Sequence, residues 1–156
     1  MSMSGVELEI QTITISREIK IAAPIEIAFE AMLEEIGPGG ELPNGKPFPM
    51  VVEQWPGGRW YRDLGDNAGH LWGHVQVIKP PTLLEICGPL MMSCPAVNHL
   101  QYRLKAEGGV TRLTFLHRAL GLIVSCHEVP FLRVVCRGVF DCARARRSAR
   151  SWMRSN

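Results

Sequence analysis

The chain has 156 residues, of which 46% are apolar, and a formal net charge of +2 at pH 7. This length fits one domain with its own core, and no apolar run reaches the ~18 residues of a membrane span. The first nine residues lack the basic and apolar regions of a secretory signal, which predicts a cytoplasmic protein. All five cysteines are then expected as free thiols: Cys87, Cys94, Cys126, Cys136 and Cys142.

The charge is divided unevenly along the chain. Residues 1–132 hold ten Lys or Arg and fourteen Asp or Glu, whereas residues 133–156 hold seven Arg and one Asp. A basic tail can bind nucleic acid or a membrane surface. No aromatic residues alternate with these arginines for base stacking. We therefore expect the solvated face of a terminal helix and no nucleic-acid partner.

The N-terminal segment predicts a strand whose inward face changes once. Apolar residues occupy even positions up to Ile10 and odd positions from Ile13 onward. Because successive strand residues point to opposite faces, a bulge or a break is expected near residues 11–12. A helix over 24–36 should follow, because Pro24 suits its first turn and apolar residues then recur at helical spacing.

Two strands are predicted over residues 49–55 and 58–64, around a Pro-Gly turn. The Asp66-Asn67 pair then marks a tight turn, because both residue types tolerate positive φ. Trp60 and Trp72 lie in this part of the chain. They either line a ligand cavity or belong to an ordinary aromatic core, and the sequence leaves both readings open.

Residues 73–86 read as a strand, a Pro80-Pro81 corner and a second strand. Each proline fixes φ and lacks an N–H, so neither can continue a central ladder. The alternation predicts Val75 and Val77 on one face of the first strand. Leu84 and Ile86 are likewise expected on one face of the second strand.

Residues 98–107 alternate between apolar and polar, and the two glycines at 108–109 predict a two-residue hairpin turn. Folding the chain across this turn sets Tyr102 opposite Phe115, with His117 on the same inward face. A buried imidazole needs a hydrogen-bond partner. His117 is therefore either a core histidine bonded to protein or a polar anchor in an apolar binding site.

The Pro-Pro hairpin, the turn Trp-Pro-Gly-Gly-Arg-Trp over 55–60, and the strand followed by Ala23-Pro24 resemble the SRPBCC superfamily of START-like helix-grip proteins. The branch that fits best is the heat-shock-protein-90 ATPase activator-like one. The resemblance spans roughly residues 13–123. It implies an α+β fold in which an antiparallel sheet of about six or seven strands wraps a long C-terminal helix around a cavity.

This resemblance implies a single domain over residues 1–156, with the sheet and N-terminal helix in 6–123. The C-terminal helix should occupy 126–150, because the inward apolar side chains of the sheet need a cover. Pro130 and Gly138 make that segment atypical for the family.

The implied function is binding of a small apolar or amphipathic molecule in the cavity. One alternative is a chaperone-linked protein–protein interaction module, which should carry an exposed apolar or charged patch. The other is a cyclase-like or hydrolase-like enzyme, which should carry a converging polar pair with a perturbed pKa. The predicted ligand-binding residues are Trp60, Trp72, Val75, Val77, Tyr102, Phe115 and His117.

No cofactor, metal site or catalytic residue is indicated by the sequence. His70 and His74 have a spacing that clamps a metal on a helix, but four residues of a strand span ~13 Å. No Gly-rich phosphate loop and no activated nucleophile motif is present. The identity of the ligand and the oligomeric state are not indicated either.

Overall fold

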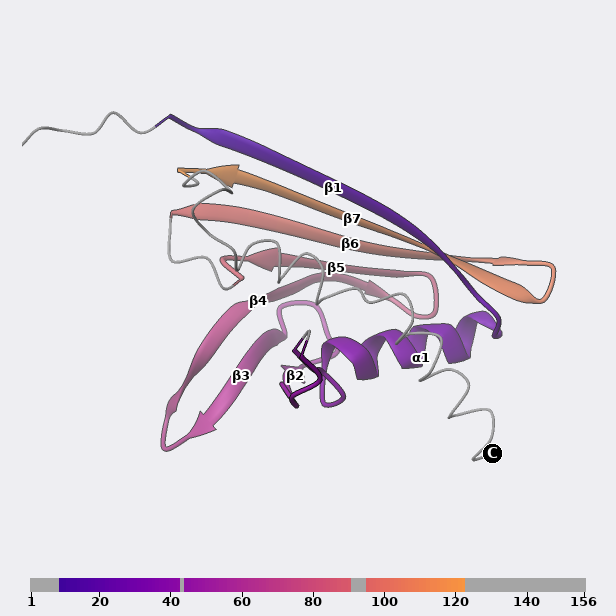
Figure 1. Ribbon diagram of the computed structural model, residues 1–156, viewed down its shortest axis with the longest axis horizontal. Helices are drawn as coiled ribbons and strands as arrows, with labels where there is room; N and C mark the ends of the chain where they lie inside the picture. Colours follow the sequence, from indigo (N-terminus) through magenta and orange to yellow (C-terminus); the bar gives the residue numbers. More distant parts are fainter. Residues whose placement is uncertain (1–8, 43, 91–94, 123–156) are drawn as a thin grey trace, which may run out of the picture.

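The computed structural model describes residues 9–42, 44–90 and 95–122. These residues form a seven-stranded antiparallel sheet and one helix, so the predicted α+β class is confirmed (Figure 1). The elements are β1 (Gln11–Ile21), α1 (Ile25–Ile36), β2 (Val51–Val52), β3 (Arg59–Gly65), β4 (Ala68–Lys79), β5 (Leu83–Gly88), β6 (Ala96–Glu107) and β7 (Val110–Gly121).

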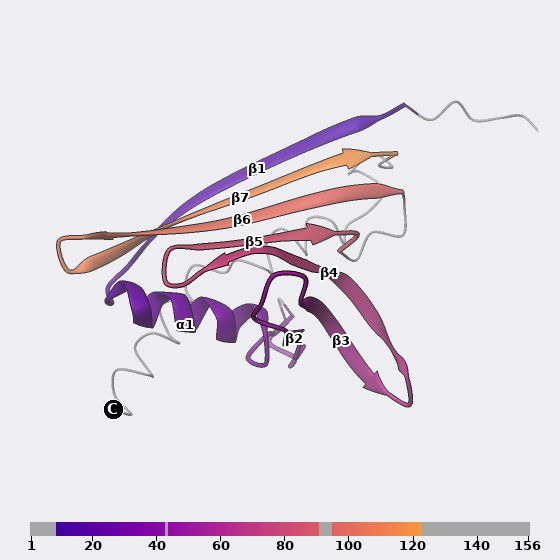
Figure 2. The same cartoon turned by 180° about the vertical axis from the view of Figure 1, so that it is seen from behind.

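The sheet has the strand order β1-β7-β6-β5-β4-β3-β2, with every pair antiparallel. Strands β2 to β7 are neighbours in chain order, and β1 joins β7 at the far edge. In Figures 1 and 2, α1 lies on one side of the curved sheet, and the β3–β4 hairpin extends away from the other strands. The long strand β1 is thus an edge strand.

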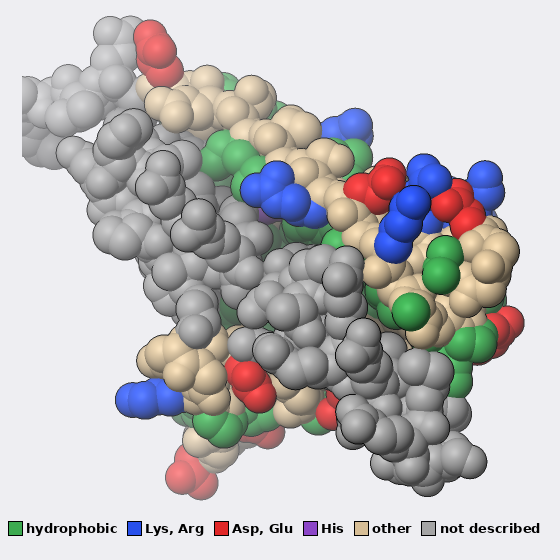
Figure 3. All heavy atoms as spheres, turned by 45° about the vertical axis from the view of Figure 1, so that its right-hand side comes forward, with side chains coloured by type: hydrophobic (Ala, Val, Ile, Leu, Met, Phe, Trp, Pro, Cys, Tyr) green, Lys and Arg blue, Asp and Glu red, His purple; other side chains and the backbone are tan. Residues whose placement is uncertain are grey.

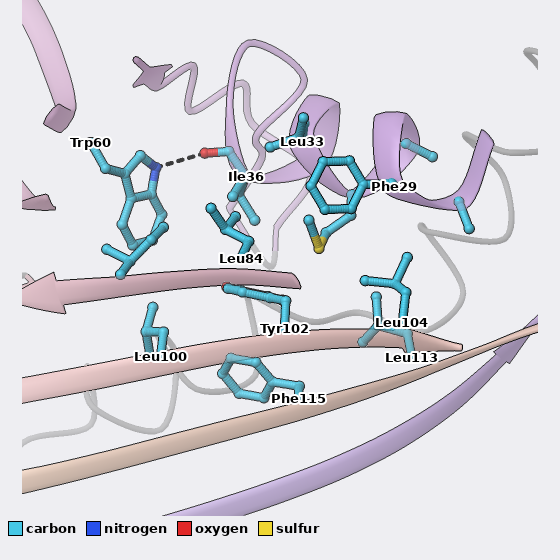
Figure 4. Packing of buried hydrophobic residues seen from close by; sticks show 14 of the residues in the cluster. Phe29, Leu33, Ile36, Trp60, Leu84, Leu100, Tyr102, Leu104, Leu113 and Phe115 are labelled. Atoms are coloured by element: carbon cyan, nitrogen blue, oxygen red, sulfur yellow. Dashed lines mark hydrogen bonds between the residues drawn. The ribbon is translucent and has the colours of Figure 1, made fainter. Parts of the chain in front are cut away.

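The face of the sheet that α1 covers is called the inner face here. Alternate side chains of the strands lie on it and pack with α1 in one apolar cluster (Figure 4). The helix contributes Ala28, Phe29, Ala31, Met32, Leu33 and Ile36. Burial of these side chains is what holds the helix on the sheet, at roughly 1.5–3 kcal/mol for each large apolar side chain.

The β6–β7 hairpin has the predicted register. Gly108 and Gly109 form its two-residue turn with φ of 56° and 86°, a conformation that glycine adopts without a steric penalty. Tyr102 therefore lies opposite Phe115, and Leu100 lies opposite His117. The alternation in the sequence was sufficient here because no bulge interrupts either strand.

Helix α1 also agrees with its prediction. Pro24 precedes the helix as its N-cap, and the apolar stripe expected from helical spacing is buried. The helix ends at Ile36, where Gly37 follows with its N–H bonded to the carbonyl of Glu34. A Cβ on Gly37 would lie 2.7 Å from the carbonyl oxygen of Leu33, so glycine suits this tight exit.

Strand β4 corrects the prediction that Val75 and Val77 share a face. A register shift lies between these two residues: Val75 pairs with Ile86, whereas Val77 pairs with Glu85. Ile78 then pairs with the buried Leu84 and packs against the core. Because of the extra residue, the side chains that follow Val75 on β4 point to the opposite sides of the sheet from those expected. Ile78 therefore points inward in place of Val77.

Other boundaries differ from the predictions by a few residues. The strand expected over 49–55 is limited to β2, because only Val51 and Val52 pair with β3. β1 begins at Gln11 and pairs with β7 without a register shift. The first part of the expected strand lies outside the described residues, so the change of face near 11–12 stays a prediction. The Asp66-Asn67 turn is confirmed, with φ of 51° and 59°. The predicted helix over 126–150 lies outside the described residues.

Candidate ligand-binding site

The strand registers arrange the inner face in rows that run across the sheet. One row passes from β1 to β4 through Ile15, His117, Leu100, Ile86 and Val75. The neighbouring row passes through Arg17, Phe115, Tyr102, Leu84 and Ile78. Directly opposite residues in antiparallel strands point to the same side, so each row is a strip of touching side chains. The inner face is therefore mainly apolar, with a few polar side chains at defined places.

The buried polar pair of the inner face is His117 with Asn98. His117 Nε2 lies 2.8 Å from Asn98 Oδ1, and the two residues are 2% and 0% exposed. The Asn98 Nδ2 group donates to the carbonyl oxygens of Gly88 and Pro89, both at 3.2 Å. Asn98 thus joins β6 to the end of β5 while it holds the imidazole of β7.

These contacts determine the orientation of both side chains. Because Asn98 Nδ2 faces two carbonyl oxygens, its Oδ1 must be the atom that accepts from His117. The neutral imidazole then carries its proton on Nε2, and Nδ1 is its basic nitrogen. Burial lowers the pKa of His117, because removal from water disfavours the charged form. The pair is therefore neutral near pH 7.

Tyr102 and Glu35 bring further polarity to the same face. Tyr102 is fully buried in the row beside His117, and its ring lies 5.0 Å from that of Phe115. Burial raises the pKa of the Tyr102 phenol, and the carboxylate of Glu35 on α1 raises it further. Tyr102 is therefore a neutral hydroxyl at any pH at which the protein would normally be handled.

Trp60 and Trp72 belong to an aromatic cluster at the β3–β4 side of the inner face. Their ring centroids lie 5.0 Å apart, and Phe48 lies 5.8 Å from Trp72. The Trp60 Nε1–H donates to the carbonyl of Ile36 at 2.8 Å (Figure 4). The indole N–H of Trp72, a side chain only 5% exposed, has no hydrogen-bond partner among the described residues. Trp60 therefore has a structural partner, and Trp72 retains a buried donor.

The inner face is more open along the edge strand β1 than elsewhere. Ile13 and Ile15 are only half-buried, and Arg17 is exposed, although they lie opposite the buried Ala119, His117 and Phe115. The burial of Ile19 and Ile21 farther along β1 is complete. The three residues Ile13, Ile15 and Arg17 form what we call the β1 rim.

A separate open groove of about 620 Å³ lies on the β3–β4 hairpin. It is lined by Arg59, Tyr61, Arg62, Asp63, Gly65, Asp66, Asn67, Ala68, Gly69, His70 and Leu71. None of the predicted ligand-binding residues lines it. Its walls mix charged residues with Tyr61, Ala68 and Leu71, and it is an open surface groove at the tip of a hairpin. We therefore take the inner face, with its buried polar pair, as the better candidate site.

Six of the seven predicted site residues lie on the inner face or in its aromatic cluster, and Val77 does not. Among the polar residues of this face, the prediction did not include Asn98, Arg17 and Glu35. A signal for the first two was present, because Asn98 has the same parity as Leu100, and Arg17 has the same parity as Ile15. Glu35 has no such signal, since only the packing of α1 brings it near Tyr102.

The described residues hold no group of three or more side chains suited to bind a metal ion. His70 and His74 lie on β4, on a strand as expected, and both are exposed. Cys87 is a free thiol whose Sγ lies 2.7 Å from Gln76 Oε1, and burial raises its pKa. The other four cysteines lie outside the described residues. No helix in the described ranges is long and apolar enough to cross a membrane.

The lowered pKa of His117 predicts a loss of stability on mild acidification. Between the folded pKa and the free-histidine value of 6.5, the unfolded chain binds a proton that the folded protein does not. The free energy of unfolding should therefore fall as the pH drops below about 7 and through the free-histidine value. In His117→Gln, which keeps a donor for Asn98 but does not titrate, this part of the slope should vanish. Urea melts of both proteins measure it, and identical slopes would contradict the prediction.

Neither a protein-family model nor a curated protein matches the chain. Solved structures do match. An uncharacterized protein from Rhizobium leguminosarum has a TM-score of 0.65 at 15% identity, with 94% of this chain and 99% of that chain covered. The Staphylococcus aureus protein SA2116 gives 0.60 at 11%, covering 94% and 98%. Ara h 8.0201 gives 0.59 at 12%, covering 94% and 100%.

At these identities the likeness concerns the fold alone. The seven-stranded antiparallel sheet and its N-terminal helix match a helix-grip fold, whereas the expected C-terminal helix lies outside the described residues.

Proposed function

We propose that the inner face binds a small, mainly apolar molecule, with the His117–Asn98 pair as the polar group beside it. The observation that carries this proposal is a neutral, hydrogen-bonded polar pair inside a mainly apolar face. Small-molecule sites combine such an apolar lining with a few convergent polar groups. The resemblance to helix-grip proteins, which implies a cavity on this side of the sheet, supports the same function.

Native mass spectrometry of the protein purified from its own source tests the proposal most directly. A retained molecule should appear as an added mass that is lost on denaturation. The neutral dye Nile red provides a second probe, because its fluorescence rises when it enters an apolar site. Wild-type protein that retains no molecule and does not bind Nile red would contradict the proposed function.

Two neighbouring substitutions on β7 test where the dye binds. Ala119 is buried on the inner face opposite Asn98, whereas Leu120 is 53% exposed on the other face. In Ala119→Phe the added ring should occupy the space beside the polar pair and raise the Nile red dissociation constant at least ~tenfold. Leu120→Phe, the matched control, should bind like wild type. Equal binding by the two variants would place the dye elsewhere.

A melting curve of Ala119→Phe shows whether the space beside Asn98 is an empty cavity or is already filled by packed side chains. An added ring in a tightly packed core costs roughly 1–3 kcal/mol, whereas a hollow accommodates it with little loss. Retained melting temperature together with lost dye binding is the result we expect. A large loss of stability would indicate that no space for a ligand exists beside Asn98.

The enzyme alternative is also supported by one observation. It required a converging polar pair with a perturbed pKa, and His117 has a lowered pKa beside Asn98. In that case the retained molecule would be turned over, and His117→Gln would bind it but leave it unchanged. Turnover that is equal in wild type and His117→Gln would remove this alternative.

A further inference from the structure

The charged side chain of Arg17 lies on a face where its partner across the ladder and its neighbours along β1 are apolar. Its partner across the ladder is Phe115, a residue only 1% exposed, and its neighbours on the same face of β1 are Ile15 and Ile19. An arginine at such a position places a cation beside the apolar floor of the candidate site. Its own side chain remains exposed at the β1 rim.

Arg17 also has no acidic partner among the described residues. Its only hydrogen bond there runs from Nη1 to the carbonyl of the adjacent Ser16, at 2.9 Å. Arg112, by contrast, pairs with Glu107 at 2.7 Å and with Glu18 at 3.6 Å. Figure 3 shows acidic and basic side chains intermingled at that end of the sheet. The guanidinium of Arg17 is therefore available to an anion from outside the described chain.

The registers also place Arg17 at the outer end of a polar diagonal. Asn98 on β6 and His117 on β7 are diagonal neighbours, and His117 and Arg17 on β1 are related in the same way. Diagonal neighbours lie ~7–8 Å apart at the backbone, within reach of long side chains. The polar path thus runs from the buried Asn98 to the exposed Arg17, while Phe115 and Tyr102 provide the apolar floor beside it.

We propose that the bound molecule is an amphipathic anion, whose negatively charged head group pairs with Arg17 at the β1 rim while its apolar body lies over Phe115 and Tyr102. This inference rests on the proposed function and adds the ligand's charge and its orientation. A planar guanidinium binds a carboxylate through two parallel hydrogen bonds, and a phosphate or sulfonate through similar ones. The head group is therefore the polar end nearest to solvent.

A second role for Arg17 must be separated from this one. Charged residues that point inward on an edge strand also discourage edge-to-edge pairing between copies of a protein. That role requires no ligand, and it predicts that neutralising Arg17 increases self-association without changing the affinity for any small molecule.

A matched pair of probes tests the inference: a dansyl-labelled long-chain fatty acid and its methyl ester, titrated into the full-length protein. We expect wild type to bind the acid more tightly than the ester. Arg17→Gln should weaken binding of the acid roughly three- to tenfold, and leave binding of the ester within about twofold. Arg17→Lys should retain most of the preference for the acid. Added salt should weaken binding of the acid but not of the ester, and only in the variants with a positive charge at position 17.

Arg118→Gln is the matched control, because Arg118 is exposed on the opposite face of β7 beside the same strand β1. It should bind both probes like wild type. The inference is overturned if wild type does not prefer the acid, if Arg17→Gln weakens both probes equally, or if that variant only self-associates. Ester binding without a preference for the acid overturns the inference alone, whereas binding of neither probe overturns the proposed function as well.

Discussion

Replacement of Asn98 with alanine should lower the free energy of unfolding by about 3 kcal/mol. Among the described residues the amide makes three hydrogen bonds inside the core: it accepts from His117 and donates to the carbonyls of Gly88 and Pro89. Alanine leaves all three partners buried without it, and each orphaned group costs roughly 1–3 kcal/mol unless water reaches it. Urea-induced unfolding at pH 7 measures the loss.

Two further variants show whether the hydrogen bonds or the shape of Asn98 matter. Asn98→Asp has nearly the same shape, but it turns an oxygen toward two carbonyl oxygens, so it should cost at least as much as alanine at pH 7. His99→Ala is the surface control, because His99 makes only a 3.6 Å contact to Glu85 and such pairs contribute ~0–1 kcal/mol. A near-neutral Asn98→Asp would show that the network contributes little.

The two buried tryptophans should respond differently to the same substitution. Trp60→Phe should cost about 2–3 kcal/mol, because it removes ring volume and also orphans the carbonyl of Ile36 at the end of α1. Trp72→Phe removes the same volume from the same cluster but breaks no hydrogen bond to the described residues, since the indole N–H of Trp72 has no partner among them. Its cost should be about 1 kcal/mol.

Thermal and urea melts of the two variants provide the comparison, with each tryptophan serving as the control for the other. We expect the two losses in free energy of unfolding to differ by about 1–2 kcal/mol, which is the contribution of the hydrogen bond between Trp60 and the end of α1. Equal losses would mean that this bond contributes nothing beyond ring packing. A larger loss for Trp72→Phe would mean that its buried N–H has a partner that the described residues do not include.

Local patterns in the sequence determined those parts of the structure that depend on near neighbours. The alternation of β6 and β7, together with the two glycines of their turn, was enough to predict that Leu100 faces His117. Helical spacing after Pro24 was enough to predict α1 and its buried stripe. These elements could be predicted because each is specified by residues a few positions apart, through steric limits on φ and through side-chain period.

The tertiary structure alone decided where those periods are broken and what crosses between elements. Despite the extra residue between Val75 and Val77, apolar and polar residues still alternate regularly along this part of the sequence. The sequence therefore does not indicate that the side chains change sides of the sheet. The bond from Trp60 to Ile36 joins residues 24 positions apart, and no local pattern specifies it.

The polar part of the site was decided in the same way. Strand alternation alone places Asn98 and Arg17 on the inner face. A polar residue at an inward position is not expected to be buried unless its hydrogen-bond partners are known. Asn98 is stable on β6 because two carbonyls at the end of β5 and an imidazole of β7 converge on its amide. Burial of a polar group is favourable only when such partners converge, and that convergence is a property of the folded sheet, which the sequence of any one strand does not contain.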